Sequence, residues 1–493
     1  MAGFLFLAVL IGWAYWPSLA HGPRGDQLNY LAEMSSRQGF TETVFGSFDL
    51  NRTRSFGPGD ELAFRPVFYF VLGLEKYFFG YDFTGWQFIG LLAHLFACGA
   101  LYALLCRIRG GLFAFLGMGL FALAPVNIEA VVWHHITPYL LFAGCVLMAL
   151  RGLYAAEHDE AKVNFHTAAA VGWMLPAVFL YETGVWYALC MGVFLWSRGR
   201  RAGAYALGGL IMFYAVANVA DLFFRHVDAA LQAGQVAGHA SFGPTFANAA
   251  LLGKWFISAL FFLAPSDLVL ISRTMVSPEL LGWAWPWGSS FNFAIGLGIA
   301  VLIAMIVLLA QNLLRKGMGK DKAFLALCLA MAAGYLAVIE VGRINVLGVF
   351  GMRVGLYYAY NFLVLVFVVA ALLSPGISMK LKMPEKVVKA LGVGVIVLMI
   401  AVHVSMVRRV TVQMARDNHV PRTFLGTLDR YVKAHAKEPG FSFYAGPECP
   451  GNYTPDWVSR RGDPPGRLYT LAEALYPLQF TRDNPKYVIK FEH

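Results

Sequence analysis

The sequence predicts an all-α polytopic membrane protein. Of its 493 residues, 58% are hydrophobic and only 14% are charged, and the mean hydropathy is +0.58. Soluble domains carry about 25% charged residues, so this composition is not that of a soluble protein. Apolar runs of roughly 20 residues recur along most of the chain, which is the length that an α-helix needs to cross a bilayer.

The basic residues indicate how the helices are oriented. The net charge is +10, but Lys and Arg fall in short loops between apolar runs, so membrane orientation explains them better than a nucleic-acid partner. If every apolar segment crossed and the N-terminus were cytoplasmic, the cluster Arg198-Gly199-Arg200-Arg201 would lie outside, which the positive-inside rule disfavours. We therefore expect two segments not to cross: 66–80, which is interrupted by Glu75-Lys76, and 249–271, which contains Lys254, Pro265 and Asp267.

The remaining segments predict one transmembrane domain, residues 1–406, with about eleven crossing helices. Residues 3–20 lack a preceding basic segment and are interpreted as a retained first helix rather than a signal peptide. A long external loop, 21–84, follows this helix. The later crossing helices are expected at 85–106, 111–124, 138–156, 165–181, 184–197, 203–224, 291–313, 323–341, 346–373 and 387–406.

The last segment, residues 407–493, differs from the rest in having few long apolar runs. It is predicted to be a small external domain. Cys449 is alone in it, and the other five of the six Cys residues lie in apolar helices without metal-ligand or disulfide spacing. No cofactor is predicted, and the sequence leaves a requirement for a divalent metal open.

Ionisable residues gather at the predicted external face, where such groups are candidates for function because they are expensive at membrane depth. Asp26 directly follows the first helix, and its plain alternative role is to cap the next one. Asp60 and Glu61 are its rivals as a base, although their Gly-Pro-Gly context favours a surface turn. The other candidates are Arg65, His94, Glu129, His134, His135, Glu182, Arg343 and Arg353.

Each of these residues also has a structural interpretation. The adjacent His134 and His135 would point about 100° apart on a helix and would rarely share a metal ion. His94 lies within a predicted helix and fits a packing histidine. Glu129 fits a helix end and Glu182 a tight turn, and the arginines fit anchoring at lipid headgroups.

Four motifs follow one another over residues 1–200: Phe64-Arg65-Pro66-Val67, Leu92-Ala93-His94-Leu95, the stretch from Phe121 to Val131, and Tyr181-Glu182-Thr183-Gly184. With an acidic residue after the first helix, this order resembles the GT-C glycosyltransferases. It is most similar to the branch of protein O-mannosyltransferases and their tetratricopeptide-containing relatives. The chain departs from that branch where Gln27, Ala124 and Tyr181 replace an acidic residue, a histidine and a lysine, and where the tail replaces the repeats.

The resemblance implies a GT-C fold and an inverting, mannosyltransferase-like transfer from a polyprenyl-phosphate-linked sugar. The acceptor, a protein, glycan or lipid, would be reached at the outer face of a bacterial inner membrane. Asp26 is expected to be the general base, because the acceptor hydroxyl must lose a proton as it attacks. Arg343, Arg353 and Arg65 are expected to bind the donor phosphate, because the planar guanidinium matches two phosphate oxygens.

Other functions stay open. A flippase or transporter of lipid-linked sugars would place ionisable residues near the middle of the membrane, in broken helices. A polymerase or ligase of lipid-linked glycans would favour a large external loop late in the chain. A non-catalytic membrane scaffold would be indifferent to the change Asp26→Asn.

Overall fold

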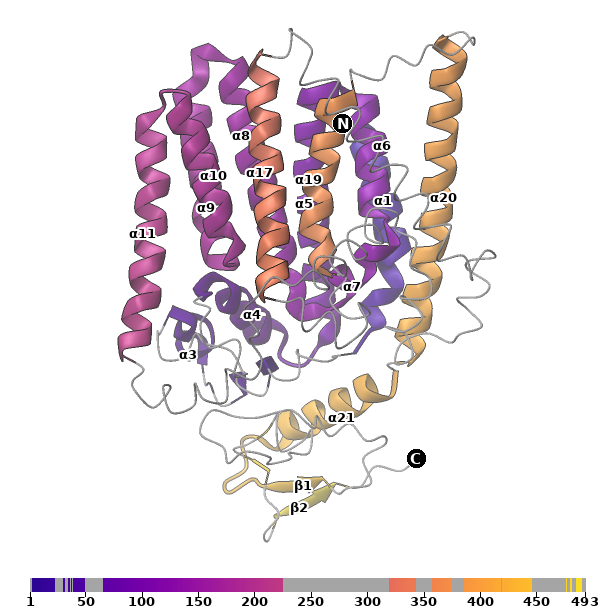
Figure 1. Ribbon diagram of the computed structural model, residues 1–493. Coiled ribbons are helices and arrows are strands. Elements are labelled where there is room, and N and C mark those ends of the chain that lie inside the picture. The colour runs from indigo at the N-terminus through magenta and orange to yellow at the C-terminus, as the bar shows by residue number, and fades with distance from the viewer. Residues whose placement is uncertain are drawn as a thin grey trace.

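The computed structural model describes residues 2–22, 65–224, 319–342, 357–374, 385–417 and 419–445, together with parts of 30–48 and 476–489. These residues form a bundle of long helices with short helices and a small tail at one end (Figure 1). That end carries α4 (Pro66–Phe79) and is called the α4 end below. The opposite end carries the short helix η5 (Glu160–Lys162) and is called the η5 end.

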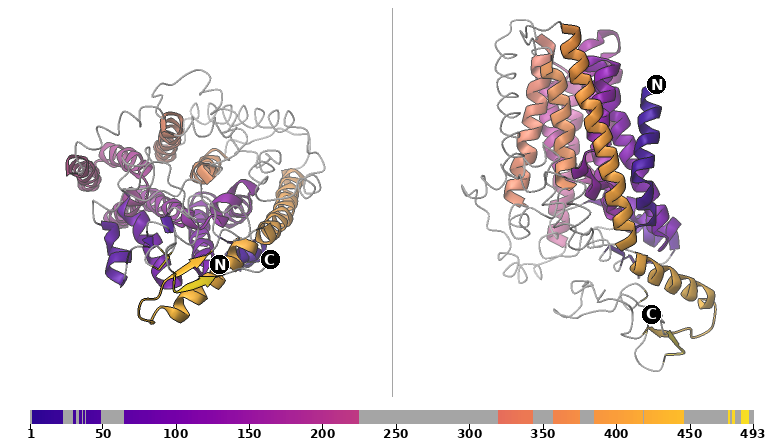
Figure 2. Two further views of the ribbon diagram at one scale, coloured as in Figure 1. Left: turned by 90° about the horizontal axis from the view of Figure 1, so that it is seen from below. Right: turned by 90° about the vertical axis from the view of Figure 1, so that its right-hand side faces the viewer.

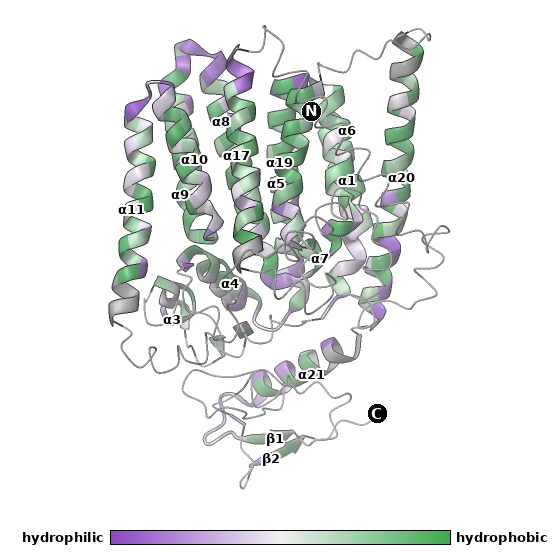
Figure 3. Cartoon of the chain, in the orientation of Figure 1, coloured by the Kyte–Doolittle hydropathy of each residue, from purple (hydrophilic) through white to green (hydrophobic). Residues whose placement is uncertain are grey.

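The long helices are apolar along their middle and hydrophilic at their ends (Figure 3). Within the described residues, seven are long and apolar enough to cross a membrane, or eight if the bent pair around Pro125 is one crossing. The chain is therefore an all-α polytopic membrane protein, as predicted. The bundle comprises α1 (Ala2–Tyr15) with η1 (Trp16–Ala20), α5 (Phe83–Arg109), α6 (Gly111–Ala122), α8 (Thr137–His158), α9 (Val163–Leu180), α10 (Thr183–Ser197), α11 (Arg201–Phe224), α17 (Gly319–Gly342), α19 (Tyr357–Leu373) and α20 (Glu385–Asp417).

These helices match the predicted crossings closely. Each predicted crossing falls on a described helix except 291–313, which lies outside the described residues together with 249–271 and the first part of 346–373. One predicted end is wrong, because α20 runs through residue 406 to Asp417. Val407, Val410 and Met414 continue its buried stripe at helical spacing. The predicted start of the tail, residue 407, thus lies inside a helix.

The core of the bundle is built around α8, whose membrane-spanning window is 78% buried. It packs against α5 and α9. Gly144 of α8 allows the ring of Phe96 on α5 to approach, since a Cβ at this position would lie 2.3 Å from that ring. At the edge of the bundle, α20 lies beside α1 (Figure 2), where the Thr411 hydroxyl donates to the Ala14 carbonyl oxygen at 3.1 Å.

Short helices cover the α4 end. Pro66 opens α4 at a position where its missing N–H costs no hydrogen bond. The predicted non-crossing segment 66–80 is this helix, which lies at the end of the bundle with α3 (Gly39–Val44) and η2 (Phe45–Phe48) (Figure 1). The predicted helix 111–124 is not straight: α6 stops at Ala122, and the chain bends by 54° into Pro125–Val132. The bent stretch consists of η3 (Pro125–Asn127), α7 (Ile128–Val132) and η4 (His134–Ile136).

The tail packs on this end of the bundle. It contains α21 (His419–His435) and the parallel strands β1 (Phe443–Ala445) and β2 (Tyr487–Ile489), with Phe443 opposite Tyr487. Leu425 and Leu428 of α21 share a buried cluster with Phe68 and Leu72 of α4. The Arg422 guanidinium also donates to the Thr84 hydroxyl oxygen at 2.7 Å. The described part of the tail thus buries apolar side chains against α4.

Candidate functional site

A bidentate ion pair at the α4 end joins two of the sequence motifs. Arg65, at the start of α4, donates from Nε and Nη2 to the two carboxylate oxygens of Glu182, each at 2.6 Å. The guanidinium also lies 4.7 Å from the centre of the Tyr181 ring. Glu182 forms the turn between α9 and α10. The pair therefore ties α4 to this turn, although 117 residues separate its members.

Tyrosines from three helices and from the α9–α10 turn meet behind this pair. The Tyr181 ring packs edge-on against Tyr139 of α8, with ring centres 4.9 Å apart. The Tyr139 hydroxyl makes a short hydrogen bond with the hydroxyl of Tyr335 on α17. Tyr335 in turn donates to the carbonyl oxygen of Tyr358 on α19 at 2.7 Å. These contacts fix α8, α17 and α19 relative to the α9–α10 turn, which gives the α4 end a rigid wall.

The bent stretch after α6 buries three more predicted candidates. Ala124-Pro125 interrupts the helix, because proline cannot supply the backbone N–H that would continue it. Glu129 in α7 and His134 and His135 in η4 are all buried here. The ring of His134 lies 5.8 Å from that of His21, and the ring of His135 lies 5.4 Å from that of Tyr30. The two histidines thus contact His21 and Tyr30, which lie before and after residues 22–29 in the sequence.

Glu75 is a buried carboxyl group that sequence analysis treated only as an interruption. It lies on the face of α4 that includes Leu72, and its side chain is 2% exposed. Neither of its oxygens has a hydrogen-bond partner among the described residues. The hydroxyl of Thr137 is near it but donates to the carbonyl oxygen of His134 at 2.9 Å. Burial raises the pKa of Glu75 well above its ordinary value, so the neutral acid is favoured.

Lys76, the next residue along α4, has aromatic and charged neighbours, unlike Glu75. The ammonium group of Lys76 lies 3.2 Å from the centre of the Tyr81 ring, on the side of the tail. Burial lowers the pKa of Lys76 to about 7, the Asp429 carboxylate opposes this shift, and Lys433 adds to it. Lys433 itself pairs with Asp429 at 2.5 Å. Lys76 therefore belongs to the contact between α4 and α21.

His94 does not join the other candidates. It lies three helical turns inside α5 and is fully buried. Its Nε2 donates to the carbonyl oxygen of Ala122 at 3.1 Å, so its Nδ1, 2.7 Å from the Tyr360 hydroxyl, accepts from that group. Both ring nitrogens are thus used to hold α5, α6 and α19 together. These contacts agree with the packing interpretation, and a role of His94 in the site stays a prediction.

The remaining candidates lie outside the described residues. They are Asp26, Asp60, Glu61, Arg343 and Arg353.

No metal centre is present in the part of the chain that the structure describes, since no three His, Cys, Asp or Glu side chains gather there in a way that could hold an ion.

Sequence reasoning could have found Glu75 but not its environment. A charged residue in an otherwise apolar segment is a signal by itself. In the sequence, Glu75 was interpreted only as a reason for segment 66–80 not to cross. Its burial depends on the packing of α4 against α8, which the sequence does not show. Gln87 was also missed. Its amide donates to the Ser18 hydroxyl oxygen at 2.9 Å and to the Val131 carbonyl oxygen at 2.8 Å, which joins η1, α5 and α7.

Comparison with known proteins gives structural neighbours only. No family model and no curated protein matches the chain. A crystal structure of ArnT from Cupriavidus metallidurans bound to undecaprenyl phosphate resembles it with a TM-score of 0.49 at 14% identity, over 90% of this chain and 82% of that one. The apo state of the same protein gives 0.46 at 16%, over 90% and 81%. ArnT is a GT-C glycosyltransferase. A likeness of this size concerns the general course of the helices and carries no argument about activity, and the O-mannosyltransferase branch stays a prediction.

Proposed function

We propose that the chain is a GT-C-type membrane glycosyltransferase. It would transfer a sugar from a polyprenyl-phosphate-linked donor to an acceptor at the α4 end, which would face the exterior of a bacterial inner membrane. In the proposed step, the acceptor oxygen bonds to the anomeric carbon as the bond from that carbon to the phosphate oxygen breaks. The electron pair leaves with the lipid phosphate, and the enzyme takes the acceptor proton.

The observation that carries this proposal is the Arg65–Glu182 pair. Two motifs that were recognised separately in the sequence are in direct contact at one end of the bundle. The third, Phe121 to Val131, contributes the buried Glu129 at the same end. The fourth, around His94, holds the helices behind it. Residues that are far apart in the sequence thus lie at the same end of the bundle, where the first helix also finishes (Figure 1).

Asp26 is proposed as the general base. Its neighbours in the chain support this role, because His21 contacts His134 and Tyr30 contacts His135. Asp26 itself lies outside the described residues, four positions from both Gly22 and Tyr30 in the sequence. A single carboxylate suffices for one inverting displacement.

The donor phosphate is assigned to Arg343 and Arg353. They lie in the connection between α17, which ends at Gly342, and α19, which begins at Tyr357. Both ends are near the α4 end of the bundle (Figure 1). Arg65 is a less suitable phosphate ligand than the sequence alone predicted, because Glu182 already balances its charge through two hydrogen bonds. We assign it a positioning role, in which it holds α4 against the α9–α10 turn.

The proposal is tested by sugar transfer with purified protein in nanodiscs, using a panel of polyprenyl-phosphate sugars and the variant Asp26→Asn. Loss of a general base costs about 10²- to 10⁴-fold in turnover, and this loss is expected with unchanged thermal stability. Asp60→Asn and Glu61→Gln serve as matched controls and should keep full activity. Wild-type activity in Asp26→Asn would contradict the assignment of the base, and movement of intact donor lipid without cleavage would contradict the transferase class.

A further inference from the structure

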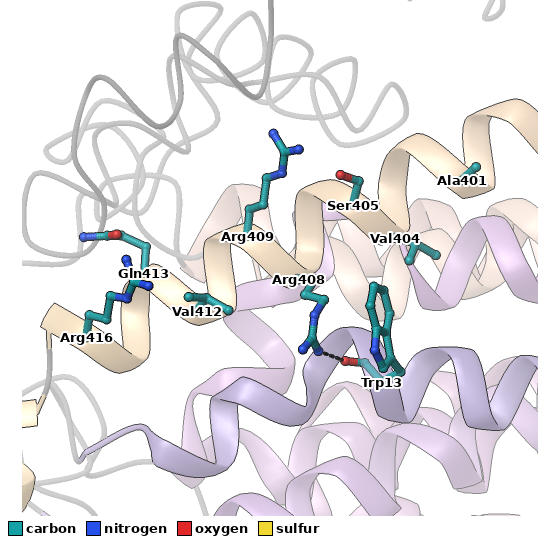
Figure 4. Close-up of a pocket in the computed structure, with 9 residues that line it drawn as sticks. All are labelled: Trp13, Ala401, Val404, Ser405, Arg408, Arg409, Val412, Gln413 and Arg416. Atoms are coloured by element: carbon teal, nitrogen blue, oxygen red, sulfur yellow. Dashed lines mark hydrogen bonds between the residues drawn. The ribbon is translucent and has the colours of Figure 1, made fainter.

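A groove opens between α1 and α20 near the α4 end of the bundle (Figure 4). Its volume is about 530 Å³. Val404 and Trp13 form an apolar part, and Arg408, Arg409 and Arg416 form a cationic part. The groove therefore combines apolar and cationic side chains.

The three arginines follow one another along α20, and Arg408 and Arg416 are about 12 Å apart along the axis. The side chain of Arg408 points toward Trp13 and α1, whereas that of Arg409 points away from them (Figure 4). Arg408 donates to the Trp13 carbonyl oxygen at 2.5 Å and lies 4.2 Å from the centre of the Trp13 ring. One arginine thus attaches the groove to α1. Among the described residues that line the groove, none is acidic.

The position of this charge in the bundle is unusual. The basic clusters of the connecting turns, with Arg109, Arg198, Arg200 and Lys320, lie at the η5 end (Figure 3). The arginines of α20 lie toward the opposite end, which the positive-inside rule makes the outer one. Long cationic side chains can reach the membrane surface from an apolar helix. A cluster of three beside an apolar groove also fits a lipid with an anionic head.

We propose that this groove binds the phosphate head of a polyprenyl monophosphate, with the start of the hydrocarbon chain along Val404 and Trp13. This proposal rests on the proposed function, because such a monophosphate is the lipid that the transfer releases. The donor is a phosphodiester with one negative charge, whereas the released phosphomonoester carries between one and two near neutral pH. The cationic part of the groove therefore matches the more highly charged product better than the donor. The groove is thus a site for the spent carrier at the edge of the bundle.

The test measures lipid binding without turnover. Native mass spectrometry would compare a short-chain polyprenyl monophosphate, its methyl diester and phosphatidylglycerol on wild-type protein and on the double variant Arg409→Gln/Arg416→Gln. Arg408 is left intact because it also holds α1. We expect the monophosphate to bind wild-type protein about tenfold more tightly than the diester, and the double variant to lose about tenfold in affinity for it.

The matched control is Arg201→Gln. Arg201 also lies over a tryptophan, 5.7 Å from the centre of the Trp196 ring, but at the η5 end and outside the groove. It should bind the monophosphate as wild type does. Equal binding of the monophosphate by wild type and the double variant, or equal binding of monophosphate and phosphatidylglycerol, would overturn the proposal. Because no sugar transfer is measured, inactivity toward every donor together with this binding preference would reject the transferase and keep the lipid-phosphate site.

Discussion

The two ends of the bundle use charged residues differently. At the η5 end, the buried Glu157 pairs with Arg198 at 3.0 Å and with Arg200 at 2.7 Å, and Lys320 pairs with Glu160 at 3.0 Å. These contacts close turns between neighbouring helices. At the α4 end the helices themselves are interrupted, and Glu75, His134 and His135 are buried there.

The difference separates charges that complete the fold from charges that are open to other roles. A carboxylate with two arginine partners, such as Glu157, is fully accounted for by structure. A buried carboxyl without a described hydrogen-bond partner, such as Glu75, is destabilising where it stands. Buried titratable groups whose pKa is strongly shifted, such as Glu75, gather at functional sites. The contrast therefore supports the proposal that the α4 end holds the active site.

The largest difference between the two ends is expected when one arginine is replaced at each end. Arg65→Gln should lower turnover by about 100-fold, because a small displacement of α4 misplaces the reacting groups. Arg200→Gln should leave the turnover of folded protein unchanged. It should instead lower the free energy of unfolding by about 1–3 kcal/mol, since Glu157 is 3% exposed and loses a charged partner. Turnover and thermal unfolding are measured on both variants.

Exchanging the charges of the Arg65–Glu182 pair separates the two roles of Arg65. The double variant Arg65→Glu/Glu182→Arg should recover most of the turnover lost in Arg65→Gln if the pair only holds α4 in place. Recovery of stability without turnover would return Arg65 to the donor phosphate, as the sequence first predicted.

A smaller effect is expected from Glu75→Gln. The pKa of Glu75 is raised in the folded protein, so the unfolded chain releases this proton first as the pH rises. Wild-type stability should therefore fall as the pH increases above about 4.5, the ordinary pKa, toward the raised one. Glu75→Gln removes this loss and should unfold at a temperature about 2 °C higher at pH 8 but not at pH 4.5. Thermal unfolding of wild type and Glu75→Gln is compared at the two pH values, and an equal difference at both would contradict this prediction.

Much of this fold could be predicted, because a bilayer allows few solutions. Apolar runs must form helices there, and the basic clusters fixed which ends lie together. The non-crossing character of α4 followed from Glu75-Lys76. The end of α20 could not be found in this way, because its last turns carry Arg408, Arg409 and Arg416 and are held by packing against η1.

The sequence identified several residues of the candidate site but not which of them contact each other. Arg65 and Glu182 were both identified, yet nothing in the sequence says that they contact each other across 117 positions. The same holds for the hydrogen bonds of His94 to Ala122 and Tyr360, which join three helices. Such contacts depend on how helices pack, and local spacing contains no information about that.

The account depends above all on which side of the membrane the α4 end faces. In a cysteine-free background, single cysteines would replace Glu42 in α3 and Glu160 in η5, two exposed glutamates at opposite ends of the bundle. Intact cells, with the outer membrane made permeable, would then be treated with a maleimide that cannot cross the inner membrane. Labelling at position 42 and not at 160 is the predicted result. Labelling at 160 and not at 42 would place the α4 end in the cytoplasm and contradict the account.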